Sequence, residues 1–145
     1  MCWYSPVSPP KRIATEDIPV YKIVYVSIDG KLIVSFFQGK EYKLNKTYKI
    51  KRLNLEKIKY SWPDYECYKI EKGFHSYSYV NEIADEFYKA DMYKALYLTL
   101  NKYIKIMKCI IPKGSIYYVN DRTVVSDTIK PVQIINPNPY TTYAG

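Results

Sequence analysis

The alternation of hydrophobic and polar positions predicts strands over most of the chain. Residues 20–28 and 31–37 are rich in β-branched and aromatic residues, which favour strands, and Asp29-Gly30 separates them. A two-residue Asp-Gly loop needs positive φ at both positions, which Asp and Gly tolerate, so these segments are predicted to form a hairpin. The same reasoning predicts further strands at residues 40–51 with a turn near Asn45, at 65–70, 103–111 and 115–120, and at 123–135 after a turn at Asn120-Asp121.

One main helix is predicted at about residues 79–90, after a turn at residues 73–77. Ser78 is placed to cap this helix. Four apolar residues fall on one face at helical spacing: Ile83, Ala84, Phe87 and Ala90. Two other segments stay ambiguous, because residues 52–64 fit a short helix or a loop and residues 91–101 fit a helix or a strand.

The order of these elements predicts an α+β fold with a mostly antiparallel, twisted sheet. The length of 145 residues fits a single domain over residues 1–145. The proline-rich segments 1–12 and 136–145 are expected to be an extended N-terminal arm and a C-terminal tail. The apolar runs fall short of the ~20 residues that a membrane span needs, and no secretory signal is visible. We therefore expect a soluble, intracellular protein.

Basic residues outnumber acidic residues, 22 to 14, which gives a formal net charge of +8. They are densest in residues 40–59, and such a stretch attracts phosphate groups in a salt-dependent way. Only three of the 22 basic residues are arginine, whose planar fork is the usual reader of base edges. Any binding to nucleic acid is therefore expected to lack sequence preference. A solvated lysine face is the alternative interpretation.

The candidate ligand-binding residues are Lys40, Lys43, Lys49, His75 and Ser76. His75 is the only histidine, and it lies in a Gly-Phe-His turn before the predicted helix, where free N–H groups favour anions. The three lysines would supply charge, and His75 and Ser76 would supply hydrogen bonds to an anionic ligand. Alternatively, His75 and Ser76 only cap the helix and complete the turn.

The sequence assigns no catalytic residue, metal ligand or cofactor. The three cysteines, Cys2, Cys67 and Cys109, lack Cys-x-x-Cys spacing, and one histidine makes no convincing zinc set. Buried free thiols are expected for Cys67 and Cys109. Cys2 would be an N-terminal nucleophile after removal of Met1, as in amidotransferases and abasic-site DNA crosslinkers, but their glycine-rich continuation is missing. We do not expect an enzyme.

Four segments together carry a resemblance: Met1-Cys2, residues 16–22, residues 72–76, and residues 109–118 leading to 126–129. They resemble a family of small uncharacterised proteins from phages and prophages of gut bacteria. The resemblance covers most of residues 1–135. It implies a phage context, with the host cytoplasm as the expected location and the virion as the alternative.

A more distant resemblance is to the layout of ADP-ribosyltransferases. It rests on the order of Tyr21-Lys22, residues 73–76 and residues 111–114. Lys22 stands where that layout has Arg or His, and Ser126-Asp127 stand where it has a catalytic Glu. Without that carboxylate, stabilisation of an oxocarbenium ion is lost, so the resemblance implies a related fold more than NAD chemistry.

The sequence therefore predicts a phage-encoded accessory binding protein. Its partner would be an anionic ligand, either a nucleotide or a nucleic acid, or else a host protein. One alternative is a virion structural or assembly protein, which would form homo-oligomers or larger assemblies. The other is a degenerate ADP-ribosyltransferase-like enzyme. A membrane partner is not expected.

Overall fold

The computed structural model of the protein describes residues 3–35, 39–61, 64–80 and 104–135. Strands make up 60% of this part of the chain, and it contains no helix. The expected α+β fold with a main helix, including the ADP-ribosyltransferase-like arrangement, is therefore wrong, because the described part of the chain is nearly all β. Residues 81–90 of the predicted helix and the ambiguous segment 91–101 lie outside the described residues.

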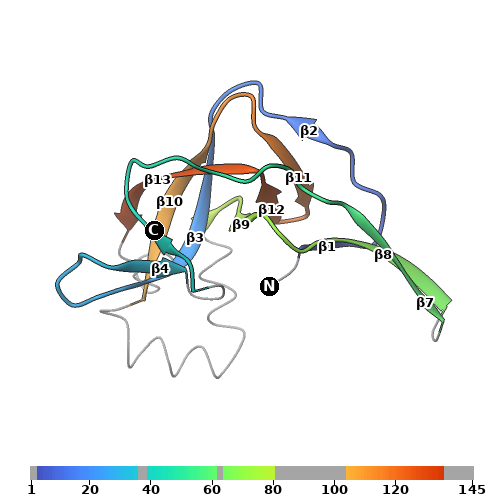
Figure 1. Ribbon diagram of the computed structural model, residues 1–145, viewed down its shortest axis with the longest axis horizontal. Coiled ribbons are helices and arrows are strands. Elements are labelled where there is room, and N and C mark those ends of the chain that lie inside the picture. Colours follow the sequence, from blue (N-terminus) through green and yellow to red (C-terminus); the bar gives the residue numbers. More distant parts are fainter. Residues whose placement is uncertain (1–2, 36–38, 62–63, 81–103, 136–145) are drawn as a thin grey trace, which may run out of the picture.

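The described residues form two antiparallel sheets (Figure 1). The strands of the larger sheet are β2 (Arg12–Ile13), β3 (Ile18–Val26), β4 (Ile33–Ser35), β5 (Glu41–Tyr42), β6 (Tyr48–Lys49), β9 (Phe74–Tyr77), β10 (Ile104–Ile111), β11 (Ile116–Asn120), β12 (Thr123–Ser126) and β13 (Thr128–Ile135). Their spatial order is β2-β11-β12-β9-β3-β10-β13-β6, with β4 also on β3 and β5 on β4. The smaller sheet consists of β1 (Trp3–Ser5), β8 (Asp64–Ile70) and β7 (Glu56–Ser61), in that order.

Strand β3 is central to the larger sheet. One of its edges pairs with β10 along almost its whole length. Its other edge is shared, because Tyr21 pairs with Tyr77 of β9, whereas residues 24–26 pair with β4. β3 therefore changes its partner between Tyr21 and Val24, and β9 diverges from it there.

The predicted hairpin at Asp29-Gly30 is confirmed as the β3–β4 connection, but its loop is longer than two residues. Ser27 N–H donates to Leu32 O (3.0 Å), and Gly30 N–H donates to Ser27 O (2.8 Å). Only Gly30 has a positive φ in this loop, 73°, so the expectation of positive φ at Asp29 is wrong. The Asp29 carboxylate instead accepts hydrogen bonds from Ser27 and Lys31, and these lower the pKa of Asp29.

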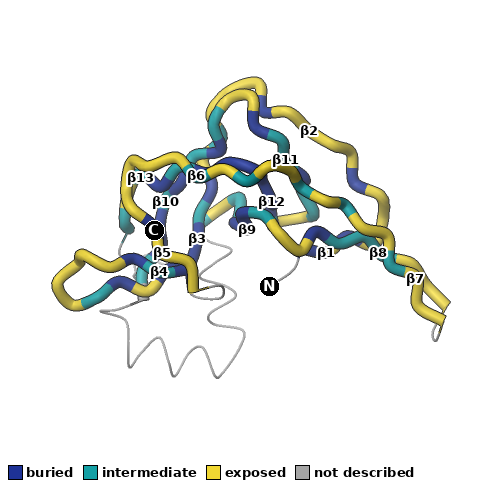
Figure 2. Tube along the Cα trace, in the orientation of Figure 1, coloured by how far each residue is buried: buried dark blue, intermediate teal, exposed yellow. Residues whose placement is uncertain are grey.

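The main core lies on one face of the larger sheet. It joins residues from strands that are far apart in the strand order: Val20, Val24, Ile33, Tyr42, Phe74, Met107, Cys109, Val124 and Ile129. Because one cluster gathers side chains from so many strands, the sheet must curve around it. Figure 2 shows buried residues along β3, β10 and β12, while the loops and β7 are exposed.

A second, smaller core connects the two sheets. It consists of Trp3, Ile70, Tyr118 and Val125. Val125 belongs to this cluster and its neighbour Val124 to the main core, as the two-residue periodicity of a strand requires. Strand β12 is thus buried on both faces.

Two local predictions are corrected by strands of the structure, and a third strand docks the N-terminal segment. Within the proline-rich segment 1–12, Trp3–Ser5 pair with β8, and the Trp3 side chain is only 2% exposed. Asn120 Nδ2 also donates to Tyr4 O (2.5 Å), which ties β1 to β11. Residues 52–64, expected to be a helix or a loop, contain strand β7, and the expected turn at 73–77 contains strand β9.

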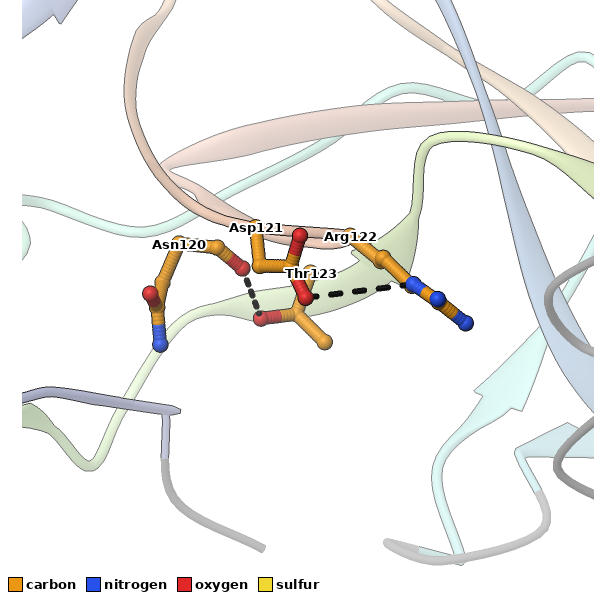
Figure 3. A network of polar contacts seen from close by, with 4 residues as sticks. All are labelled: Asn120, Asp121, Arg122 and Thr123. Atoms are coloured by element: carbon orange, nitrogen blue, oxygen red, sulfur yellow. Dashed lines mark hydrogen bonds and ion pairs between the residues drawn. The ribbon is translucent and has the colours of Figure 1, made fainter.

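The predicted turns at Asn45 and at Asn120-Asp121 are confirmed. Asn45 has a φ of 65° between the short strands β5 and β6, so residues 40–51 form two strands rather than one. Asp121 has a φ of 54° between β11 and β12. In that turn, Thr123 Oγ1 donates to Asn120 O (3.0 Å), and Arg122 Nε lies 3.8 Å from Asp121 Oδ2 (Figure 3).

Candidate functional site

A lysine lies inside the main core. In β3, Lys22 is in phase with Val20 and Val24, which face the core, and it is only 5% exposed. Its Nζ donates a hydrogen bond to the backbone carbonyl of His75 in β9. This carbonyl lies where β9 diverges from β3. The Lys22 ammonium therefore takes the position that a backbone N–H of β3 would have in a continuous ladder. The partner change of β3 therefore creates a polar position within an apolar core.

Two ammonium groups lie close to one tyrosine ring. The ring centre of Tyr42 is 5.7 Å from Lys22 Nζ and 5.9 Å from Lys40 Nζ. Lys22 is buried and Lys40 is exposed, so the two charges lie at different depths beside the same ring. Lys40 Nζ is also 5.2 Å from the ring centre of Tyr48 and 5.9 Å from that of Phe74. Such cation–ring contacts are favourable and hold the Lys40 side chain over the aromatic group.

Two buried hydroxyl groups at this end of the core have no hydrogen-bond partner among the described residues. They are Tyr42 OH and Ser76 Oγ, on residues that are 1% and 3% exposed. Continuing the register from Tyr21↔Tyr77 places Ser76 on the same face as Lys22. A buried polar atom without a partner costs about 1–3 kcal/mol, and each such atom in a native protein needs an explanation. A polar ligand or water at this position would supply one.

The electrostatics of this cluster are unusual because two ammonium groups lie close together with no carboxylate of the described residues paired to either. Burial lowers the pKa of Lys22 to about 8, and Lys40 contributes to the lowering by repulsion. Burial raises the pKa of Cys109 to about 12, although Lys22 opposes that rise. Burial also raises the pKa of Tyr42. None of the ion pairs within the described residues includes Lys22 or Lys40. We call Lys22, Lys40, Tyr42 and Ser76 the lysine cluster.

The structure brings together two of the five residues predicted for the site. Lys40 and Ser76 both belong to the lysine cluster. Lys43 is adjacent, because its backbone N–H donates to Tyr48 OH (2.8 Å). Lys49 is exposed and follows Tyr48 in β6, so it points away from the core that Tyr48 packs against.

His75 is separated from Ser76 by the alternation of β9. It pairs with Val125, whose side chain lies in the second core, whereas Ser76 pairs with Val124 of the main core. His75 is buried, and its Nε2 atom has no hydrogen-bond partner within residues 3–35, 39–61, 64–80 and 104–135. Burial, together with repulsion by Lys22, lowers the pKa of His75 to about 4. Its link to the cluster is its carbonyl oxygen. The imidazole does not lie on the exterior beside the basic stretch.

The basic stretch at residues 40–59 does not gather on one surface. Its first lysines lie around β5 and the turn that follows, whereas Lys57 and Lys59 lie on β7. Figure 1 shows the β7–β8 hairpin projecting on the opposite side of the molecule from β4.

The sequence analysis did not place Lys22 or Tyr42 among the ligand-binding residues. For Lys22 a signal was present, because a lysine between two valines at i−2 and i+2 shares their face of a strand. Nothing comparable marks Tyr42, since the chain has 18 tyrosines and only the β4–β5 pairing places this one inside.

Other kinds of site find little support in the described residues. They include no group of three or more His, Cys, Asp or Glu side chains that could hold a metal, and no helix long and apolar enough to span a bilayer. Cys109 is free and buried, as expected, and Cys67 is free but half-buried. Cys2 lies outside the described residues.

Comparison with known proteins adds no relative: no family model, no curated protein and no solved structure matches this chain.

Proposed function

We propose that the protein binds an anionic ligand at the lysine cluster. The observation that carries the proposal is the convergence of Lys22 and Lys40 on the Tyr42 ring, together with two buried hydroxyls that find no partner in the described part of the chain. An anion there would relieve the repulsion between the ammonium groups and accept hydrogen bonds from the hydroxyls. Charge-assisted hydrogen bonds of this kind are about twice as strong as neutral ones.

A nucleotide fits this site better than a simple anion. Tyr48 is half-buried, and its ring lies 5.2 Å from both Lys40 Nζ and Lys46 Nζ. A base stacked on Tyr48 would place its phosphate among these lysines, with Lys22 deeper inside. Arginine forks, which read base edges, are absent from the cluster, so the base would be held by stacking without selection among bases. In the phage context that the sequence suggests, such a protein would act as an accessory binding protein in the host cell.

The experiment is a calorimetric titration of the full chain with AMP, inorganic phosphate and adenosine. We expect AMP to bind most tightly, phosphate more weakly, and adenosine weakest. Lys40→Ala should weaken AMP binding about tenfold, the effect of losing one charge-assisted contact of ~1.4 kcal/mol. Lys22→Met, which keeps the volume of the side chain but removes its charge, should weaken AMP and phosphate binding by at least as much.

The matched control is Lys113→Ala, which removes an exposed lysine from the loop between β10 and β11. It should leave AMP binding unchanged. If Lys113→Ala and Lys40→Ala weakened binding equally, the attraction would come from net charge and the proposed site would be wrong. Absence of any heat with AMP and phosphate in low-salt buffer would also overturn it.

A further inference from the structure

Strand β7 is the free edge of the smaller sheet. All six of its residues pair with β8 in regular register, and no described strand pairs with its other side. Five of the six residues are exposed, and the β7–β8 hairpin projects from the molecule (Figures 1 and 2). An edge of this kind presents unpaired N–H and C=O groups, which are a template for another strand.

The two faces of the hairpin differ in chemistry. Ile58 and Tyr60 lie on one face, where the Tyr60 ring stacks on Tyr65 across the strands with 4.5 Å between ring centres. These two tyrosines are 36% and 47% exposed. Lys57 and Lys59 lie on the other face. The edge therefore alternates lysine with apolar or aromatic side chains.

One lysine of the hairpin stays outside its ion pairs, although it lies directly across the strands from Glu66: this is Lys59. Lys57 Nζ is 3.2 Å from Glu66 Oε2, and Lys69 Nζ is 3.9 Å from Glu56 Oε2. Lys59 forms no ion pair with any described residue. An incoming strand would place side chains directly across from Lys57 and Lys59, where opposite charges stabilise the pair and like charges destabilise it.

This pattern opposes pairing with a second copy of the chain. In an antiparallel pair, residues that lie directly opposite each other have their side chains on the same face of the sheet. Two β7 strands related by a twofold axis therefore pair odd-numbered residues with odd-numbered ones and even-numbered residues with even-numbered ones. In the two such registers that pair most of the strand, Lys57 or Lys59 faces a lysine of the other copy, as when Lys57 lies opposite Lys59. Lysines on an exposed edge are a known protection against self-association.

We propose that the β7 edge binds an extended acidic segment of a partner protein by strand addition. Acidic residues at alternate positions of that segment would face Lys57 and Lys59. Apolar residues between them would extend the face of Ile58 and Tyr60. Main-chain hydrogen bonds supply affinity in this mode, and the alternating side chains supply specificity.

The test is fluorescence anisotropy of the full chain with a labelled peptide that alternates glutamate and valine. We expect this peptide to bind and its lysine–valine counterpart not to bind. Lys59→Glu should weaken binding about tenfold, and Lys113→Glu should leave it unchanged. Two further peptides carry N-methyl groups on either the odd or the even amides, and one of these two should lose binding, because only one set of amides faces β7.

Three results would overturn the proposal. Equal binding of both N-methylated peptides and the unmodified one would mean that charge alone attracts the peptide. Displacement of the peptide by oligothymidylate would assign the surface to nucleic acid. A dimer in sedimentation that Lys59→Glu abolished would assign it to a second copy. Lys40→Ala should bind the acidic peptide normally, so failure of the anion site and failure of this edge are separable.

Discussion

The ammonium group of Lys22 donates a hydrogen bond to the backbone carbonyl of His75, a residue 53 positions away in the chain. The bond joins β3 to β9 where their ladder has ended. It also places a titratable cation beside the backbone of the only histidine, and each of the two groups is buried. Stability should therefore depend on pH through both residues.

Lys22 should make the protein more stable as the pH rises from 7.5 to 9. Its pKa is about 8 in the folded state against 10.5 as the ordinary value, so the unfolded chain binds more protons in this window. Linkage then requires the free energy of unfolding to rise, by about 1 kcal/mol over these pH values. Urea denaturation of the wild-type chain and Lys22→Met measures the difference. A Met variant with the same pH slope would contradict the assignment.

His75 should destabilise the folded state in acid. Its pKa is about 4 when folded against 6.5 ordinarily, so the unfolded chain takes up a proton first as the pH falls. The loss of stability between pH 7 and pH 5 should be about 2 kcal/mol. The variant His75→Gln, which does not titrate, should show a loss smaller by this amount in thermal melts. Equal losses in the two proteins would exclude His75 as the cause.

Gly73 should not tolerate a side chain. A Cβ at this position would lie 2.6 Å from Val125 Cγ2 and 2.7 Å from Leu53 Cδ2. Gly73→Ala should therefore reduce the free energy of unfolding by about 1–3 kcal/mol, the usual cost of overpacking. Adding Leu53→Ala removes one of the two clashing groups, so the double variant should lose less than the sum of the single changes. Simple additivity in urea denaturation would argue against the clash.

Asp127 should be a structural carboxylate. It is buried, and its Oδ1 accepts hydrogen bonds from Ile116 N–H (3.1 Å) and Thr128 Oγ1 (2.9 Å). Asp127→Ala leaves both donors without a partner, which should cost about 1–3 kcal/mol or more. Asp121→Ala is the control, since its ion pair with Arg122 is exposed and should contribute less than about 1 kcal/mol. Comparable losses in chemical denaturation would contradict this role.

Local signals in the sequence were reliable where a short segment decides its own structure. The Asp29-Gly30 hairpin and the turns at Asn45 and Asn120-Asp121 depend on residues that tolerate positive φ, and all three turns are present. Strand β10 could be predicted from its apolar, β-branched run, which is typical of a buried strand. In the structure it lies between β3 and β13. These features need no knowledge of the rest of the chain.

The errors arose where distant segments decide the outcome. Residues 73–77 were predicted to be a turn, but β12 pairs with residues 74–77 on one side and β3 pairs with Tyr77 on the other, which makes a strand. Tertiary pairing overrides local preference in such cases. The same limit applies to the candidate site, because Lys22, Tyr42 and Ser76 come from three strands, β3, β5 and β9, that meet only in the folded sheet.

The pairing of β3 with β10 has a consequence for how the chain reaches its native state. The central strand of the larger sheet obtains its longest partner from residues that lie 79 (Tyr25 to Ile104) to 93 (Ile18 to Ile111) positions downstream. Until β10 and β13 have been synthesised and have left the ribosome, the apolar face of β3 stays partly exposed to water. Folding should therefore be slow and largely post-translational. Nascent chains should depend on chaperones, or on the net positive charge, to avoid aggregation.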